Sequence, residues 1–158
     1  MPTIPRRLRA PLTFLPFLAA VAVAAIVGGL AAADARTVYS GLELPPFAPP
    51  AWLFGPVWTV LYIGIAVSGW LYWRSNGDRR ALVWYVAQLV LNAAWTPLFF
   101  AAGAYTVALV DIALLDVAIA VTALRFRRTS RVSAALLLPY LAWTLYATAL
   151  NAAIVVLN

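Results

Sequence analysis

The sequence predicts an all-α integral membrane protein, a bundle of five transmembrane helices. Hydrophobic residues make up 65% of the 158 residues and charged residues only 10%, and the mean hydropathy is +0.92. A soluble domain is typically about half apolar and about a quarter charged, so a soluble fold of this length could not bury so much apolar surface. The apolar residues form five runs of the roughly 20 residues that a spanning helix needs. The length favours one domain over residues 1–158.

The first apolar run covers residues 10–33 and follows a basic segment with Arg6, Arg7 and Arg9. A basic start, an apolar centre and a small-residue end are also typical of a cleaved signal peptide. The run is longer than the apolar region of a signal peptide, which usually spans about 7–15 residues. We therefore expect a retained transmembrane helix, with cleavage as the alternative.

Residues 34–50 form the first loop, and its second half is rich in proline. The prolines are Pro45, Pro46, Pro49 and Pro50. Each lacks a backbone N–H and disfavours the α conformation in the residue before it, so we expect a stiff, extended loop. An aromatic helix follows directly, and its Trp58 and Tyr62 share one face because they are four residues apart. We expect the functional site where the loop lies over this face.

Four further helices are predicted after the loop, over residues 51–73, 81–101, 104–126 and 132–157. The connection between the first two contains Asn76-Gly77, a typical turn pair. Thr129 or Ser130 can cap the last helix at its N-terminus, and Pro139 should bend that helix.

The basic residues are all arginines, and they lie at the ends of the apolar runs. The N-terminus, the segment 74–80 and the segment 125–131 carry all of them except Arg36, which lies in the first loop. Cytoplasmic loops of membrane proteins carry an excess of basic residues. We therefore expect the N-terminus on the cytoplasmic side, and the proline loop and the C-terminus on the opposite side. The net charge of +6 is explained by topology, and no nucleic-acid partner is expected.

The chain contains no cysteine and no histidine. This composition excludes disulfides, zinc sites built from Cys or His, cysteine nucleophiles and histidine general bases. We expect no resident metal and no cofactor.

Three amide side chains lie within the predicted helices, where a lipid-facing surface would reject them. Gln88, Asn92 and Asn151 should therefore point inward. Trp58, Trp95 and Trp143 lie farther from the helix ends than the other tryptophans and would together suit a large flat apolar ligand, because indole rings offer a wide contact area. The alternative is that each amide only forms hydrogen bonds that hold the helices together.

Asp111 and Asp116 lie inside the predicted helix 104–126. A carboxylate within the membrane is a candidate functional group. The alternative is a structural role, with the carboxylate bonded to a hydroxyl, an amide or a water between helices. No histidine or lysine exists as a partner base, so proton coupling is not favoured.

Several stretches together resemble the translocator protein family, also called the tryptophan-rich sensory (TspO/MBR) or peripheral benzodiazepine receptor family. The matching stretches are Tyr39-Ser40-Gly41-Leu42 with Pro45, PPAW at 49–52, GPVWTVLY at 55–62, AQLVLNAAWTPLFF at 87–100, ALVD at 108–111 and LPYLAWTLYATALN at 138–151. After Asn151 the chain lacks the tyrosine and basic residue of the sterol motif in animal members.

The resemblance implies a five-helix bundle, often a homodimer, whose pocket opens near the first loop. Family members bind porphyrins, sterol-like lipids and benzodiazepine-type ligands there, so the implied partners are a tetrapyrrole or lipid ligand and the membrane lipids. Carried over by position, the ligand-binding residues would be Tyr39, Trp58, Tyr62, Asn92, Trp95, Phe99, Trp143, Ala147 and Asn151.

Three functions follow from these observations as hypotheses. The first is a receptor or carrier for protoporphyrin IX, haem or a similar flat molecule, with a sensory or tetrapyrrole-regulating role. The second is light- and oxygen-dependent porphyrin degradation, for which the resemblance implies Trp58 and Trp143 as the catalytic residues. The third is a structural or regulatory partner protein whose cavity holds only lipid. The arginine-rich, lysine-free composition suggests a bacterium, and the cytoplasmic membrane is favoured over the outer membrane.

Overall fold

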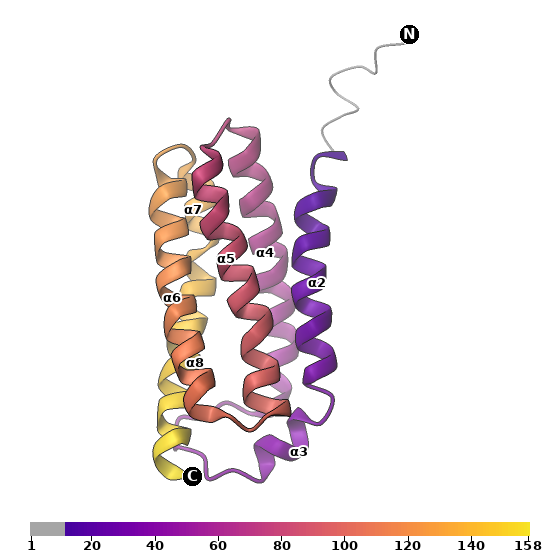
Figure 1. Ribbon diagram of the computed structural model, residues 1–158, viewed down its shortest axis with the longest axis vertical. Coiled ribbons are helices and arrows are strands. Elements are labelled where there is room, and N and C mark those ends of the chain that lie inside the picture. The colour runs from indigo at the N-terminus through magenta and orange to yellow at the C-terminus, as the bar shows by residue number, and fades with distance from the viewer. Residues whose placement is uncertain (1–11) are drawn as a thin grey trace.

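The computed structural model describes residues 12–158, and all regular elements in this range are helices (Figure 1). The chain order is α2 (Leu15–Ala31), α3 (Ala35–Ser40), η1 (Ala51–Leu53), α4 (Phe54–Arg74), α5 (Arg79–Thr96), η2 (Pro97–Ala101), α6 (Tyr105–Arg127), α7 (Arg131–Leu136) and α8 (Leu138–Leu157). The long helices run side by side along one axis and form a bundle.

Four stretches within residues 12–158 are long and apolar enough to cross a membrane: Ala51–Arg74, Arg79–Ala101, Tyr105–Arg127 and Arg131–Leu157. They match four of the predicted runs to within a few residues. The remaining run was predicted over residues 10–33, but α2 ends at Ala31, where the N–H of Ala32 bonds the carbonyl of Gly28. Residues 10 and 11 lie outside the described part. Since α2 has 17 residues, the count of five spans stays a prediction.

The first loop is only partly extended, which corrects the sequence-based expectation. Its first half forms the short helix α3, because the prolines that block a helix begin only at Pro45. The second half contains a turn, in which the N–H of Ala48 bonds the carbonyl of Pro45 at 2.9 Å. Pro50 is extended, as expected for a residue beside a run of prolines.

Two prolines reshape the spanning stretches. Pro97 cannot donate to the carbonyl four residues before it, and the chain widens there into a π-helix with the N–H of Ala102 bonded to the carbonyl of Pro97. Pro139 lies in the first turn of α8, and the helix is interrupted at Leu137. This interruption lies where a bend was predicted, and the bend itself stays a prediction. The predicted cap is confirmed, since Ser130 accepts a bond from the N–H of Ser133.

The turn between α4 and α5 contains the predicted pair Asn76-Gly77, and each residue suits its position in the turn. Asn76 has a φ of 55°, a left-handed conformation that asparagine tolerates better than most residues. A Cβ at Gly77 would lie 2.2 Å from a ring carbon of Tyr72, so only glycine fits there. Asp78 then caps α5, and the helix begins two residues earlier than predicted.

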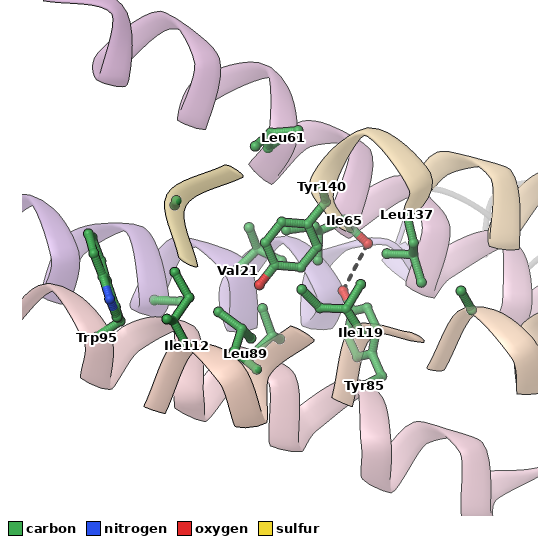
Figure 2. Packing of buried hydrophobic residues seen from close by; sticks show 14 of the residues in the cluster. Val21, Leu61, Ile65, Tyr85, Leu89, Trp95, Ile112, Ile119, Leu137 and Tyr140 are labelled. Atoms are coloured by element: carbon green, nitrogen blue, oxygen red, sulfur yellow. Dashed lines mark hydrogen bonds between the residues drawn. The ribbon is translucent and has the colours of Figure 1, made fainter. Parts of the chain in front are cut away.

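The centre of the bundle is filled by aromatic and branched side chains. Tyr72 of α4 stacks on Phe126 of α6, with ring centroids 3.8 Å apart. The hydroxyl of Tyr85 donates to the backbone carbonyl of Ile65 at 3.0 Å, and Tyr140 lies beside this bond without exposed surface (Figure 2). These contacts join α4, α5, α6 and α8 into one core.

The two ends of the bundle differ in charge. The α4–α5 and α6–α7 connections lie at one end, and α3 lies with the C-terminus at the other (Figure 1). Seven arginines belong to the first end: Arg74, Arg79, Arg80, Arg125, Arg127, Arg128 and Arg131. Of the described arginines, only Arg36 belongs to the end with α3.

Candidate functional site

A cavity of about 390 Å³ lies at the α3 end of the bundle, and one of its walls consists of small residues. This wall is formed by Ala25, Gly28 and Gly29 of α2 and by Ala32, the residue that directly follows this helix. Their spacing of three, one and three residues places them on one face of the helix. A Cβ added at Gly29 would meet no atom within 4 Å, so the wall is flat and open there.

The opposite wall is aromatic and belongs mainly to α4. Phe54, Trp58 and Tyr62 line it, together with Gly55 and Thr59. The rings of Trp58 and Tyr62 lie 5.3 Å apart at an angle of 31°. A flat face of small residues thus opposes a face of aromatic rings, and the space between them suits a flat, apolar molecule.

Helix α3 closes the end of this space with Arg36 and Tyr39. The hydroxyl of Tyr39 donates to the carbonyl of Pro49 at 3.0 Å and ties α3 to the proline-rich half of the loop. Burial, followed by the nearby Tyr146, raises the pKa of Tyr39 to about 12. The hydroxyl therefore keeps its proton at neutral pH and remains a donor.

The loop is also hydrogen-bonded to α8 and to Asn158, the residue that follows this helix. The hydroxyl of Tyr146 donates to the carbonyl of Phe47 at 2.7 Å. The side-chain amide of Asn158 donates to the carbonyl of Glu43 at 3.1 Å and accepts from its N–H at 3.0 Å. These bonds hold the loop across the α3 end of the bundle.

A second, much smaller cavity lies next to the first, towards α8. Its lining residues are Tyr39, Phe54, Trp95, Phe99, Phe100, Ala147, Leu150 and Asn151. Tyr39, Phe54, Trp95 and Phe100 border both cavities, so their side chains form the partition between them.

The structure does not bring all the expected ligand-binding residues into one cavity: some line the larger cavity, some only the smaller one, and two line neither. Tyr39, Trp58, Tyr62 and Trp95 line the larger cavity, and Phe99, Ala147 and Asn151 line only the smaller one. Asn92 lies behind the aromatic wall, where its side-chain oxygen accepts from the hydroxyl of Tyr62 at 3.0 Å. Trp143 packs against Phe54 at 6.0 Å between ring centroids and is not among the residues that line either cavity. A role of these residues in binding stays a prediction.

All three intramembrane amides point inward, as predicted. Gln88, Asn92 and Asn151 are 0%, 4% and 1% exposed. Asn151 accepts from the indole N–H of Trp95 at 3.3 Å and donates to the carbonyl of Tyr105 at 3.0 Å. Neither polar atom of the Gln88 amide has a partner in the described part of the chain. Asn151 thus fits the structural alternative, whereas Gln88 does not.

The two aspartates are buried in α6. One oxygen of Asp116 accepts from the hydroxyl of Thr148 of α8 at 2.7 Å, which is the structural arrangement that the sequence left open. One oxygen of Asp111 has no partner among the described residues. Neither aspartate lines the two cavities.

Several lining residues were not anticipated from the sequence. They are Ala25, Gly28 and Gly29 on α2, Ala32 directly after this helix, Gly55 and Thr59 on α4, and Arg36 on α3. The helical spacing of the small residues on α2 was visible in the sequence. The spacing alone could not distinguish a cavity wall from a tight helix contact, because both favour small side chains.

Comparison with known proteins gives one consistent result. The model of the TspO/MBR family matches residues 17–157. The tryptophan-rich protein TspO of Archaeoglobus fulgidus is 41% identical over 143 residues, which cover 89% of this chain and 93% of that protein. The human translocator protein is 42% identical over 118 residues, 72% of this chain and 70% of that protein. The tryptophan-rich sensory protein of Cereibacter sphaeroides is 35% identical over 138 residues, 87% and 86% of the two chains.

Proposed function

The chain belongs to the TspO/MBR family and is an integral membrane protein, and on this premise we propose that it is a receptor or carrier for porphyrins or similar flat hydrophobic molecules. The role would be sensory or tetrapyrrole-regulating. The observation that carries this proposal is the cavity between the flat wall of α2 and the aromatic wall of α4.

The size and lining of the cavity support a small-molecule ligand. Its volume of about 390 Å³ falls within the range of about 300–1,000 Å³ that is typical of ligand pockets. Aromatic rings such as Trp58 gain contact with a flat partner while giving up few rotamers. A tetrapyrrole is larger than this space alone, so the partition at Phe54 would have to shift to admit it fully.

Titration of the detergent-solubilised protein with protoporphyrin IX in the dark tests the proposal. We expect saturable quenching of tryptophan fluorescence, because Trp58 and Trp95 line the cavity. Trp58→Phe should weaken the quenching, and Trp52→Phe is the control, because Trp52 is 65% exposed and outside the cavity. If there is no saturable quenching, the proposal is wrong, and the cavity is better assigned to lipid or to a structural role.

The place of Trp58 in the cavity wall also supports a second function, light- and oxygen-dependent porphyrin degradation. Under this hypothesis Trp58 and Trp143 are both required. Trp143 packs against Phe54, which borders the cavity, so only Trp58 would touch a ligand directly. Pigment loss under light that continues unchanged in Trp58→Phe and in Trp143→Phe would exclude this function.

We further propose that α2 is the fifth span of a single domain. Its 17 residues extend roughly 26 Å at 1.5 Å per residue, close to the thickness of a bilayer core. It lies beside α4 and α5 in the bundle (Figure 1). The seven arginines at one end support a cytoplasmic location for that end, with α3 and the C-terminus on the other side. A homodimer in a bacterial cytoplasmic membrane completes this proposal.

A further inference from the structure

We propose that the ligand of the cavity carries an acidic group and that Arg36 binds this group at the edge of the cavity. The inference rests on the proposed function and adds a chemical class to it. The ligand would have a flat apolar body and at least one carboxylate.

Of the described residues that line the cavity, Arg36 is the only charged one. Its side chain is exposed, and it forms no ion pair or hydrogen bond with any residue in the range 12–158. Asp34 and Glu43 lie in the same loop, yet neither is paired with it. A guanidinium without a partner at the edge of an apolar cavity is therefore available to an acidic ligand.

The position of Arg36 suits this task. It lies three residues before Tyr39 on α3, and both side chains line the cavity. Because Tyr39 is bonded to Pro49, the short helix is held in place over the cavity. A guanidinium can bind a carboxylate through two parallel hydrogen bonds, and this geometry favours a planar acidic group.

Topology does not account for this arginine. The other described arginines lie at the opposite end of the bundle, where an excess of basic residues sets the orientation of a membrane protein (Figure 1). A single arginine at the end with α3 opposes that excess. A role in recognition explains why a positive charge is placed there and directed to the cavity.

The walls define the rest of the ligand. The other residues that line the cavity are uncharged, and most are apolar or aromatic. Gly29 and Gly55 line the cavity with open space around an added Cβ, so a flat ring system can approach the backbone of α2 and α4. The acidic group would then remain at the membrane surface, where water and Arg36 both stabilise its charge.

Two probes with the same ring system test the proposal: protoporphyrin IX, which has two carboxylates, and its dimethyl ester, in which both are replaced by uncharged methyl ester groups. Both are titrated in the dark into the full chain in a neutral detergent, with tryptophan fluorescence as the readout. For Arg36→Gln we expect the dissociation constant of the acid to rise about five- to ten-fold, the loss expected for one partly exposed charge-assisted pair, and that of the ester to stay within about two-fold. Added salt should weaken the binding of the acid and leave the binding of the ester unchanged, because salt screens the attraction between exposed charges.

Two further variants complete the design. Arg128→Gln removes the same charge from an exposed site at the opposite end, so it should leave both dissociation constants unchanged. Arg36→Lys keeps the charge but loses the fork of donors, so it should restore part of the affinity for the acid.

The outcomes separate this inference from the proposed function. If both probes bind the wild type and Arg36→Gln weakens neither, or weakens both equally, the inference is wrong while the proposed function stands. An equal loss in Arg128→Gln would also overturn it, since net charge alone would then explain the effect. If neither probe binds the wild type, the proposed function fails and the inference fails with it.

Discussion

Replacing Gln88 by methionine should stabilise the protein, although it removes a fully buried amide. Gln88 has no exposed surface, and neither of its side-chain polar atoms has a partner in the described part of the chain. Burying an amide without hydrogen bonds is costly, because the group gave up its partners in a wetter environment. Methionine is also unbranched and fills nearly the same space without this cost.

The magnitude follows from the missing partners. An unsatisfied buried polar group costs about 1–3 kcal/mol in a soluble protein, and side-chain hydrogen bonds within membranes contribute about 0.6 kcal/mol on average. We therefore expect Gln88→Met to raise the free energy of unfolding by about 1–2 kcal/mol. At about 2–4 °C per kcal/mol for a chain of this length, the melting temperature should rise by roughly 2–8 °C.

Asn151→Leu is the matched comparison, because Asn151 is equally buried but has both partners. This variant breaks the bonds to Trp95 and Tyr105 and leaves the indole N–H of Trp95 without an acceptor. We expect it to lower the melting temperature. The assay is thermal unfolding of both variants in one detergent, followed by circular dichroism. If Gln88→Met lowers the melting temperature as much as Asn151→Leu, Gln88 has a partner such as a buried water, and the reasoning is wrong.

Three further predictions concern the cavity, its ligand and the α4–α5 turn at the opposite end of the bundle. Gly29→Phe should fill part of the cavity and weaken protoporphyrin binding at least ten-fold (about 1.4 kcal/mol) in the fluorescence titration. Val23→Phe is the control, because Val23 lies on the exposed face of α2 and the change should not weaken binding. If the two variants bind protoporphyrin with equal affinity, the ligand binds elsewhere. Free-base protoporphyrin should bind at least as tightly as haem in the same titration, because the chain has no histidine or cysteine to ligate iron. A much tighter haem complex, with the absorption spectrum of an axially ligated iron, would contradict this prediction. Gly77→Ala should lower the stability by about 1–3 kcal/mol, because its Cβ would overlap the ring of Tyr72. Gly55→Ala is the control: Gly55 lies in α4 with open space around it, so the change should leave the stability unchanged or raise it by up to about 1 kcal/mol. Thermal unfolding of both variants checks this, and an equal loss in both would contradict it.

The helices after the first loop were predictable because each is a long apolar run with a clear boundary signal. Pro139, Ser130 and the pair Asn76-Gly77 act locally, and the structure has a helix interruption next to Pro139, a cap at Ser130 and a turn at Asn76-Gly77. The inward direction of the amides was predictable as well, because lipid offers no hydrogen-bond partner. Helix α3 was missed because the abrupt change to polar residues, glycine and proline after the first apolar run was interpreted as a loop over all of residues 34–50.

The candidate site was predictable only in part. The sequence could indicate that Trp58 and Tyr62 share a face, but it could not show that α2 supplies the opposite wall. It also could not show that Phe54 separates the space beside Trp58 from the space beside Asn151. From the sequence, Arg36 was only the one arginine in a loop that was predicted to lie outside the cytoplasm. Its position at the edge of the cavity depends on how α3 lies across the end of the bundle, which no local pattern shows.

The sequence by itself determined that the chain is an all-α membrane protein and, to within a few residues, where its long apolar helices begin and end, because hydropathy, proline and capping act over a few residues. It also determined which polar groups must avoid lipid. Only the tertiary structure decided which helix faces meet, where their small and aromatic residues leave an open space, and which buried polar groups find a partner. These outcomes depend on contacts between residues far apart in the chain, such as Tyr62 with Asn92 and Glu43 with Asn158, and no local pattern specifies them.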